Sequence, residues 1–275
     1  IINQIITNLP LLYEWHSKNI LNKFGNVKWN EAIIELHKPE NIGKYKKNFY
    51  QRLAFDEIFS TFLVNSEIRK KIKKIKKEGK FIDNTKQNNI IKSLKFSLTN
   101  DQKKTLEEIN LDLSSTNKMF RLLQGDVGSG KTIVSLLAAY NTVNSGFQVA
   151  IMAPTEILAR QHYNFARKIF SNQMNIELIS GKSEYKTKKE ILKKLAKNEI
   201  NIIFGTHAIF QKKVFFKNLG LIIIDEQHKF GVNQRKRLSD KGGNNCDVLL
   251  MTATPIPRTL TMTLYGDMDL SIIRE

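Results

Sequence analysis

The strongest constraint on the fold is a glycine-rich loop set between a short apolar run and a helical segment. Residues 125–132 match the pattern G-x-x-x-x-G-K-[ST], with the apolar run 120–123 before them and helical residues 133–141 after them. Glycine lets the backbone curl until successive N–H groups face one centre, and the following helix adds the positive end of its dipole. We therefore predict a phosphate-binding loop made of Gly125, Asp126, Val127, Gly128, Ser129, Gly130, Lys131 and Thr132.

From about residue 93 onward, short β-rich runs alternate with longer amphipathic runs. This alternation predicts an α/β fold of crossover units, with a parallel sheet flanked by helices on both faces. The run 221–224 is apolar on both faces of any strand, so we expect it at the centre of the sheet. Strands are predicted at 120–123, 149–153, 176–179, 200–204, 221–224 and 248–251, and helices starting near Lys131, Glu156, Lys186 and Asn233.

The first part of the chain has a different pattern, with apolar residues at helical spacing and no β-rich runs. We predict a smaller helical region over residues 1–85, a polar linker at 79–89, and the α/β domain over residues 86–275. The lysine-rich run 69–77 is either a solvated basic face over an apolar seam or a DNA contact, and the solvated face is favoured. Because the chain begins at Ile1 rather than Met, we expect it to be a piece of a longer protein.

The composition limits the class of protein further. The net charge of +18, from 44 basic and 26 acidic residues, suits a partner rich in phosphates. The excess of Lys, Ile and Asn is also what an AT-rich genome produces, so the charge alone is weak support for nucleic acid. The single cysteine, Cys246, excludes an internal disulfide or a cysteine-based zinc site. No apolar run is long enough for a bilayer and no secretory signal is evident, so we expect a cytoplasmic protein without a membrane partner.

A carboxylate pair follows the predicted central strand. Magnesium prefers hard oxygen ligands and keeps several waters, so one carboxylate at a strand's carboxyl end suits it. We assign this role to Asp225, with the hydroxyl of Thr132 beside it, and expect Glu226 to orient or deprotonate an attacking water. Lys131 should reach the β- and γ-phosphates of ATP. Such a pair is often only a helix cap, but its position two crossover units after the glycine-rich loop favours the functional interpretation.

Three further motifs follow predicted strands: Ala153-Pro154-Thr155, Gly205-Thr206-His207 and Thr252-Ala253-Thr254. Each alone is an ordinary helix cap. Together with the glycine-rich loop and Asp225-Glu226, and in this order, they resemble the RecA-like motor domain of helicase superfamily two. The strings around residues 123–130, 225–235 and 252–260 look like those of RecG-type DNA helicases, with Ser129 and Gln227 separating them from the transcription-repair coupling factor. The resemblance is dense over residues 95–275.

The resemblance implies roles for further residues. Phe96 and Gln102 fall in the element that recognises adenine, with Gln102 reading the base edge. Gln227 and His228 would couple the γ-phosphate to Thr252, Ala253 and Thr254, although a structural turn is the alternative. Arg235 and Arg258 would face either DNA or another domain. Contacts to nucleic acid are expected from Pro154, Thr155, Gly181, Thr206 and His207.

The resemblance also implies partners. In RecG-type helicases a second RecA-like domain supplies arginines to ATP, and an amino-terminal wedge splits branched double-stranded DNA at stalled forks and Holliday junctions. We therefore expect the 275 residues alone to bind ATP–magnesium weakly and to hydrolyse it barely, since an arginine finger contributes about 10³–10⁵ in rate. Two alternatives remain: a translocase like the repair coupling factor, and a P-loop ATPase that serves as a non-motor switch.

Overall fold

The computed structural model describes residues 6, 8–10, 12–37, 46–170, 173–179, 185–211, 213–226, 243–254 and 268–274. Among these residues, contacts divide the chain into two compact units, the first ending at Glu67 and the second beginning at Ile68. The functional boundary that we placed between residues 85 and 86 stays a prediction. No helix in the described ranges is both long enough and apolar enough to cross a membrane.

The first unit is helical around a buried arginine. It contains α2 (Lys18–Leu21), the 3-10 helix η1 (Asn22–Phe24), α3 (Trp29–His37) and α4 (Lys46–Lys74) as far as Glu67. Arg52 is 0% exposed and pairs with Glu14 at 2.9 Å and with Asp56, which also lies 2.6 Å from His16 Nε2. Removing a charge of this kind from water is costly unless it is paired, and Glu14 and Asp56 supply that compensation.

The second unit contains a seven-stranded parallel sheet, as the alternating pattern predicts. Its order is β3-β4-β2-β5-β6-β1-β7, and every neighbouring pair is parallel. β5 occupies the middle position, which confirms the expectation from its apolar run. The strands are β1 (Phe120–Gly125), β2 (Gln148–Met152), β3 (Ile176–Ile179), β4 (Ile202–Gly205), β5 (Leu219–Ile224), β6 (Asp247–Thr252) and β7 (Asp269–Ile273).

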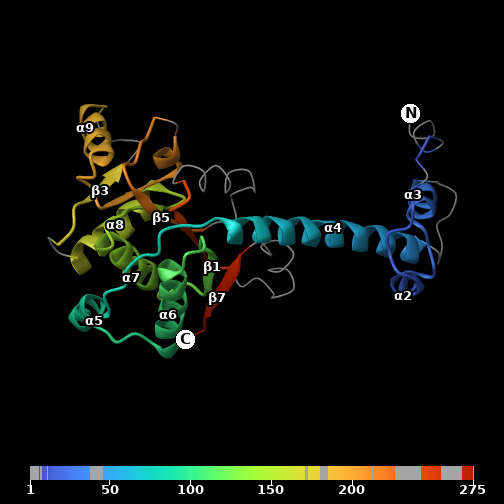
Figure 1. The fold of residues 1–275 in the computed structure, drawn as a ribbon, viewed down its shortest axis with the longest axis horizontal. Helices are drawn as coiled ribbons and strands as arrows, with labels where there is room; N and C mark the ends of the chain where they lie inside the picture. Colours follow the sequence, from blue (N-terminus) through green and yellow to red (C-terminus); the bar gives the residue numbers. More distant parts are fainter. Residues whose placement is uncertain are drawn as a thin grey trace. The chain divides into compact units, whose positions relative to one another are not determined.

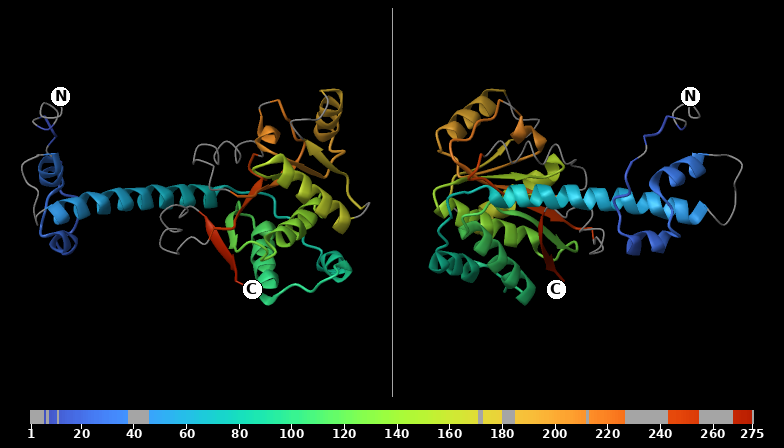
Figure 2. Two further views of the ribbon diagram at one scale, coloured as in Figure 1. Left: turned by 180° about the vertical axis from the view of Figure 1, so that it is seen from behind. Right: turned by 45° about the vertical axis from the view of Figure 1, so that its right-hand side comes forward.

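Helices cover both faces of this sheet (Figures 1 and 2). From β1 to β3 the chain moves along the sheet in one direction, so right-handed crossovers place α7 (Lys131–Asn144) and α8 (Glu156–Phe170) on one face. α6 (Asn100–Ser114) packs against α7 on that face. The chain then turns back from β3 to β4, which places α9 (Tyr185–Ala196) on the other face. α7 and the five strands β1, β2, β4, β5 and β6 form most of the buried core.

The segment predicted as a polar linker is partly helical. Residues 84–93 form α5 (Asn84–Ser93), because Asp83 caps it by accepting hydrogen bonds from the N–H groups of Thr85 and Lys86. The predicted helix near Asn233 lies outside the described residues. The strand β7 was not predicted.

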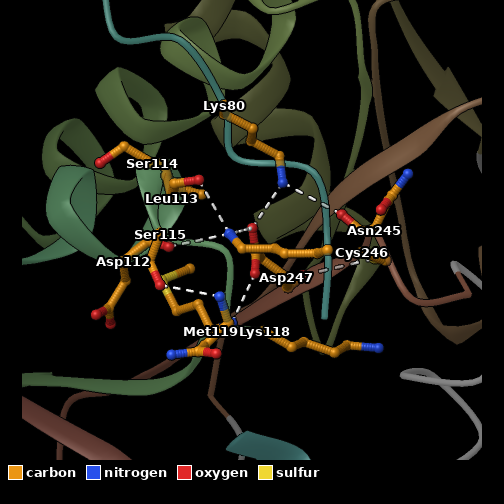
Figure 3. A network of polar contacts seen from close by, with 12 residues as sticks. Lys80, Asp112, Leu113, Ser114, Ser115, Lys118, Met119, Asn245, Cys246 and Asp247 are labelled. Carbon is orange, nitrogen blue, oxygen red and sulfur yellow. Dashed lines mark hydrogen bonds and ion pairs between the residues drawn. The ribbon is translucent and has the colours of Figure 1, made fainter. Parts of the chain in front are cut away.

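A buried ion cluster attaches the segment after α4 to the amino end of the sheet (Figure 3). The Nζ atoms of Lys77 and Lys80 each lie 2.6 Å from Asp247 Oδ2, and Asp247 Oδ1 accepts the N–H of Met119 at 2.7 Å. Both lysines and Asp247 are buried. Burial lowers the pKa of Lys77 from its usual value, while the charge of Asp247 acts against that shift. We call Lys77, Lys80, Met119 and Asp247 the Asp247 cluster.

The rest of the lysine-rich run behaves as a surface face. Arg69 pairs with Asp269 at the start of β7, and Lys73 Nζ lies 3.4 Å from the same carboxylate. These side chains are partly exposed, so their pairing is worth far less than that of the Asp247 cluster. Of residues 69–77 only Lys77 is buried, and the choice between a solvated face and a DNA contact for the others stays a prediction.

Candidate functional site

The glycine-rich loop joins the carboxyl end of β1 to the first residue of α7, Lys131. Gly128 and Gly130 have φ angles of 87° and 84°, the left-handed region that glycine tolerates. A Cβ at Gly130 would lie 2.3 Å from Gln102 Nε2, so no larger residue fits there unchanged. The hydroxyl of Ser129 is buried without a hydrogen-bond partner among the described residues. A curled backbone, a helix start and an unpaired buried hydroxyl fit a phosphate group.

Lys131 lies inside this loop. Its Nζ donates to the carbonyl oxygens of Gly125 and Asp126, both at 2.7 Å. Burial lowers the pKa of Lys131 from its usual value, and the nearby carboxylates of Asp225 and Glu226 oppose the shift. The ammonium group of Lys131 is thus held by carbonyl oxygens of the same loop whose N–H groups would bind a phosphate.

Asp225 follows β5 and is held by three hydrogen bonds. Its N–H donates to Met152 O at 2.9 Å, its Oδ1 accepts the N–H of Glu226 at 3.1 Å, and its Oδ2 lies 2.8 Å from His162 Nε2. Glu226 has a φ of 54°, an uncommon value for a residue with a side chain. Strain of this kind recurs at functional sites, where the surrounding structure maintains it.

A cavity of about 530 Å³ brings these groups together. It gathers residues with predicted roles from the segment around the start of α6, the glycine-rich loop, the start of α7, the residues after β5 and the loop after β6, and three residues of α8 that were not predicted also line it. The predicted members are Phe96, Gln102, Val127, Gly128, Gly130, Lys131, Thr132, Asp225, Glu226 and Ala253. The additional ones from α8 are Gln161, His162 and Phe165.

A sequence signal for His162 existed. A helix that starts at Glu156 repeats its face every three or four residues, so Thr155, Leu158 and His162 are aligned on one side. Because α8 begins just after β2, its first turns lie near the carboxyl edge of the sheet, where the glycine-rich loop also lies. Periodicity could have placed His162 at this edge, whereas its partner could come only from the tertiary fold.

Gln102 connects the start of α6 to the glycine-rich loop. It forms a capping box with Thr99, since its Oε1 accepts the Thr99 N–H at 3.0 Å and its own N–H donates to Thr99 Oγ1 at 3.3 Å. Its Nε2 also donates to Ser129 O at 2.9 Å. Phe96 is 47% exposed at the cavity, as a ring available for stacking would be. Recognition of adenine by these two residues stays a prediction.

The residues expected to contact nucleic acid follow strands of the same parallel sheet, so they share its carboxyl edge. Pro154 and Thr155 follow β2, and Thr206 and His207 follow β4. Thr155 Oγ1 accepts the N–H of Leu158 at 3.3 Å and so caps α8. Their contact with a polynucleotide stays a prediction.

The loop after β6 is folded on itself. Thr252 Oγ1 lies 2.9 Å from Thr254 Oγ1 and accepts the Thr254 N–H at 3.2 Å. Thr252 is buried, Ala253 lines the cavity and Thr254 is exposed. These three consecutive residues therefore run from a buried position through the cavity wall to an exposed position. Five residues with predicted roles lie outside the described part of the chain: Gly181, Gln227, His228, Arg235 and Arg258.

Comparisons with known proteins agree with this geometry. A relative from Streptococcus pneumoniae named ATP-dependent DNA helicase RecG is 43% identical over 270 residues, which cover 97% of this chain and 40% of the relative. A RecG from Aquifex aeolicus is 46% identical over 251 residues, which cover 89% of this chain and 32% of the relative. A solved structure of RecG bound to a three-way DNA junction matches with a TM-score of 0.77 at 39% identity, over 96% of this chain and 35% of that chain.

These comparisons confirm the resemblance to RecG that the motifs indicated. The chain spans roughly a third to two fifths of the length of these relatives. Residues 99–263 match the family described as DEAD/DEAH box helicase, a range that contains the glycine-rich loop, Asp225 and Thr252. The chain belongs to the DEAD/DEAH box helicase family.

Proposed function

We propose that this chain is the ATP-binding half of a RecG-type DNA motor, which couples ATP hydrolysis to remodelling of branched double-stranded DNA. One observation carries the proposal: Lys131, Thr132 and Asp225 line one cavity, at the sheet edge where the loops after β2, β4 and β6 also lie. A cavity for ATP that adjoins the loops expected to contact DNA is what a motor requires.

Each group in the cavity has a chemical task. The N–H groups of the glycine-rich loop and the ammonium of Lys131 would bind the β- and γ-phosphates and stabilise charge that develops during transfer. Glu226 would accept a proton from the attacking water. Thr132 and Asp225 would hold a magnesium ion, which stabilises phosphate charge as a Lewis acid. The described residues hold no group of three or more His, Cys, Asp or Glu side chains that could bind a metal, and magnesium needs none because water and phosphate fill its shell.

The DNA-related part of the proposal rests on the same edge of the sheet. Backbone and hydroxyl groups at Pro154, Thr155, Thr206 and His207 would hold phosphates without reading bases. Gly181 would contribute to this track, and Gln227 and His228 would couple the cavity to Thr252, Ala253 and Thr254. A second RecA-like domain and a wedge domain of the same full-length protein would complete the motor, as in the RecG-type family.

The test is ATP hydrolysis by the full-length protein with and without branched DNA. Lys131→Ala should abolish DNA-stimulated hydrolysis, because it removes the cation that binds the phosphates. Lys103→Ala, an exposed lysine on α6, loses the same charge outside the cavity and should hydrolyse ATP at the normal rate. Full activity in Lys131→Ala would contradict the assignment of the phosphate site.

The DNA substrate separates the remaining alternatives. A RecG-type motor should be stimulated more by forked or three-way DNA than by linear duplex. Equal stimulation by both would favour a general translocase such as the repair coupling factor. Hydrolysis that no DNA stimulates would indicate a P-loop switch and not a motor.

A further inference from the structure

We infer that His162 is a positioning residue for Asp225, and that it ties the orientation of this carboxylate to the segment that carries Pro154 and Thr155. The inference rests on the proposed function of the cavity, since Asp225 matters there as a magnesium ligand. Its starting point is the 2.8 Å contact between His162 Nε2 and Asp225 Oδ2. A carboxylate can only accept, so Nε2 carries the proton and donates it.

The contact is shielded from water. The side chains of His162 and Asp225 are 13% and 12% exposed. A hydrogen bond to an ionised group in such surroundings is stronger than one at the surface, because water competes less for either partner. The imidazole ring can therefore restrict rotation of the Asp225 carboxylate.

The contact also reaches across the sheet. α8 packs against β3 and β4, while Asp225 follows β5, and β2 lies between β4 and β5. The contact therefore joins a helix that packs on β3 and β4 to the residue that follows β5. The hydrogen bond thus joins two parts of the site that lie 63 residues apart in the sequence.

Asp225 is attached to the same segment a second time. Its backbone N–H donates to Met152 O, the last residue of β2, at 2.9 Å. The chain from Met152 through Pro154 and Thr155 to His162 therefore holds Asp225 at its backbone and at its carboxylate. Any displacement of the β2–α8 segment moves both attachment points of the proposed magnesium ligand.

Each carboxylate oxygen of Asp225 accepts one hydrogen bond from a neighbouring residue. Oδ1 accepts the Glu226 N–H and Oδ2 accepts from His162, so one lone pair on each oxygen stays free for another ligand. Partners that orient a ligating carboxylate are worth about 10–100-fold in metal affinity in known sites. Loss of the His162 bond should therefore weaken magnesium more than it weakens the nucleotide itself.

The experiment separates magnesium binding from nucleotide binding in the full-length protein. Methylanthraniloyl-ADP fluorescence is titrated at a series of magnesium concentrations and also in EDTA. His162→Phe keeps a ring but loses the donor, and His162→Gln keeps an N–H donor at a similar distance. Asn164→Ala changes an exposed residue of the same helix and serves as the matched control.

We expect His162→Phe to raise the magnesium concentration for half-maximal nucleotide binding by roughly 10-fold or more. His162→Gln should restore most of that loss, and Asn164→Ala should match the wild type. Binding in EDTA and the thermal midpoint by circular dichroism should be the same in all four proteins.

Two results would overturn the inference while leaving the proposed function intact. One is an unchanged magnesium requirement in His162→Phe, and the other is an equal loss with and without magnesium, which would make His162 a packing residue only. If the full-length wild type does not bind the nucleotide at all, the proposed function fails and the inference fails with it. If the wild type binds it without any dependence on magnesium, only the inference fails.

Discussion

The buried core strongly changes the acidity of one side chain, the thiol of Cys246. Cys246 is fully buried next to Asp247, and burial raises its pKa to about 12 from an ordinary value of 9.0. The folded chain therefore keeps the thiol proton over a pH range in which an unfolded chain loses it. The group is inert in the fold and reactive only after unfolding.

This protonation difference predicts a pH dependence of stability. Between about pH 9 and pH 12 the folded state binds one more proton than the unfolded state, so stability falls as pH rises. Relative to Cys246→Ala, the wild type should lose about 1.4 kcal/mol of unfolding free energy between pH 8 and pH 10. Urea titrations at both pH values measure this difference. A wild type that keeps its margin over Cys246→Ala at pH 10 would show that the thiol ionises within the fold.

The sequence predicts the role of some single residues but not of others. The glycine-rich loop was predictable because the chemistry of a phosphate cradle needs adjacent residues, and Asp225 because a strand end places it. His162 and Lys80 were not assigned, because their partners Asp225 and Asp247 come from distant strands. The residues next to a histidine or lysine in a helical or polar stretch do not show which distant residue its side chain will contact.

At the scale of elements, the Asp247 cluster attaches the segment after α4 to the amino end of β6. Asp247 carries one negative charge against two buried ammonium groups, and Lys80 also lies 4.9 Å from the ring centre of Phe147. Removal of one partner from a buried ion pair leaves a charge without compensation. The cluster should therefore be far more sensitive to mutation than the surface pair at β7.

Matched substitutions test this difference. Asp247→Asn retains the acceptor for the Met119 N–H but removes the charge, and should lower the unfolding free energy by about 3–5 kcal/mol. Asp269→Asn removes the same charge from a carboxylate that is 28% exposed, and should cost at most about 1 kcal/mol. Urea unfolding measures both losses, provided that the dependence of the unfolding free energy on urea concentration is the same in the two variants. Similar losses in the two variants would mean that burial adds nothing to the cluster.

Most elements of the sheet unit were predictable, because buried parallel strands are almost entirely apolar and amphipathic helices separate them. β7 escaped notice since its residues alternate between half-buried and buried positions and include Asp269 and Ser271. α5 was missed because its polar composition resembles a linker, and only the cap at Asp83 distinguishes it. A strand interrupted by polar residues and a polar helix lack the hydrophobic signal on which such predictions depend.

At the scale of the molecule, the proposed cavity supplies one side of an ATP site. In the proposed RecG-type motor a second RecA-like domain would complete it with arginines, and an arginine finger contributes about 10³–10⁵ in rate. The 275 residues alone should therefore hydrolyse ATP about 10³-fold or more slowly than a full-length RecG relative under the same conditions. Steady-state phosphate release measures this, with Lys131→Ala as the background. Equal rates would show that this chain carries every group that hydrolysis needs.

The strand order also affects how this chain can fold while it is being synthesised. β1 is synthesised well before its two neighbours in the sheet, β6 and β7, because β2 to β5 lie between them in the sequence. Until Asp247 and Asp269 have been synthesised, β1 has neither neighbour, and its apolar residues must be sheltered in another way. The nascent chain is thus most prone to aggregate in that interval, and a chaperone that delays its collapse would act there.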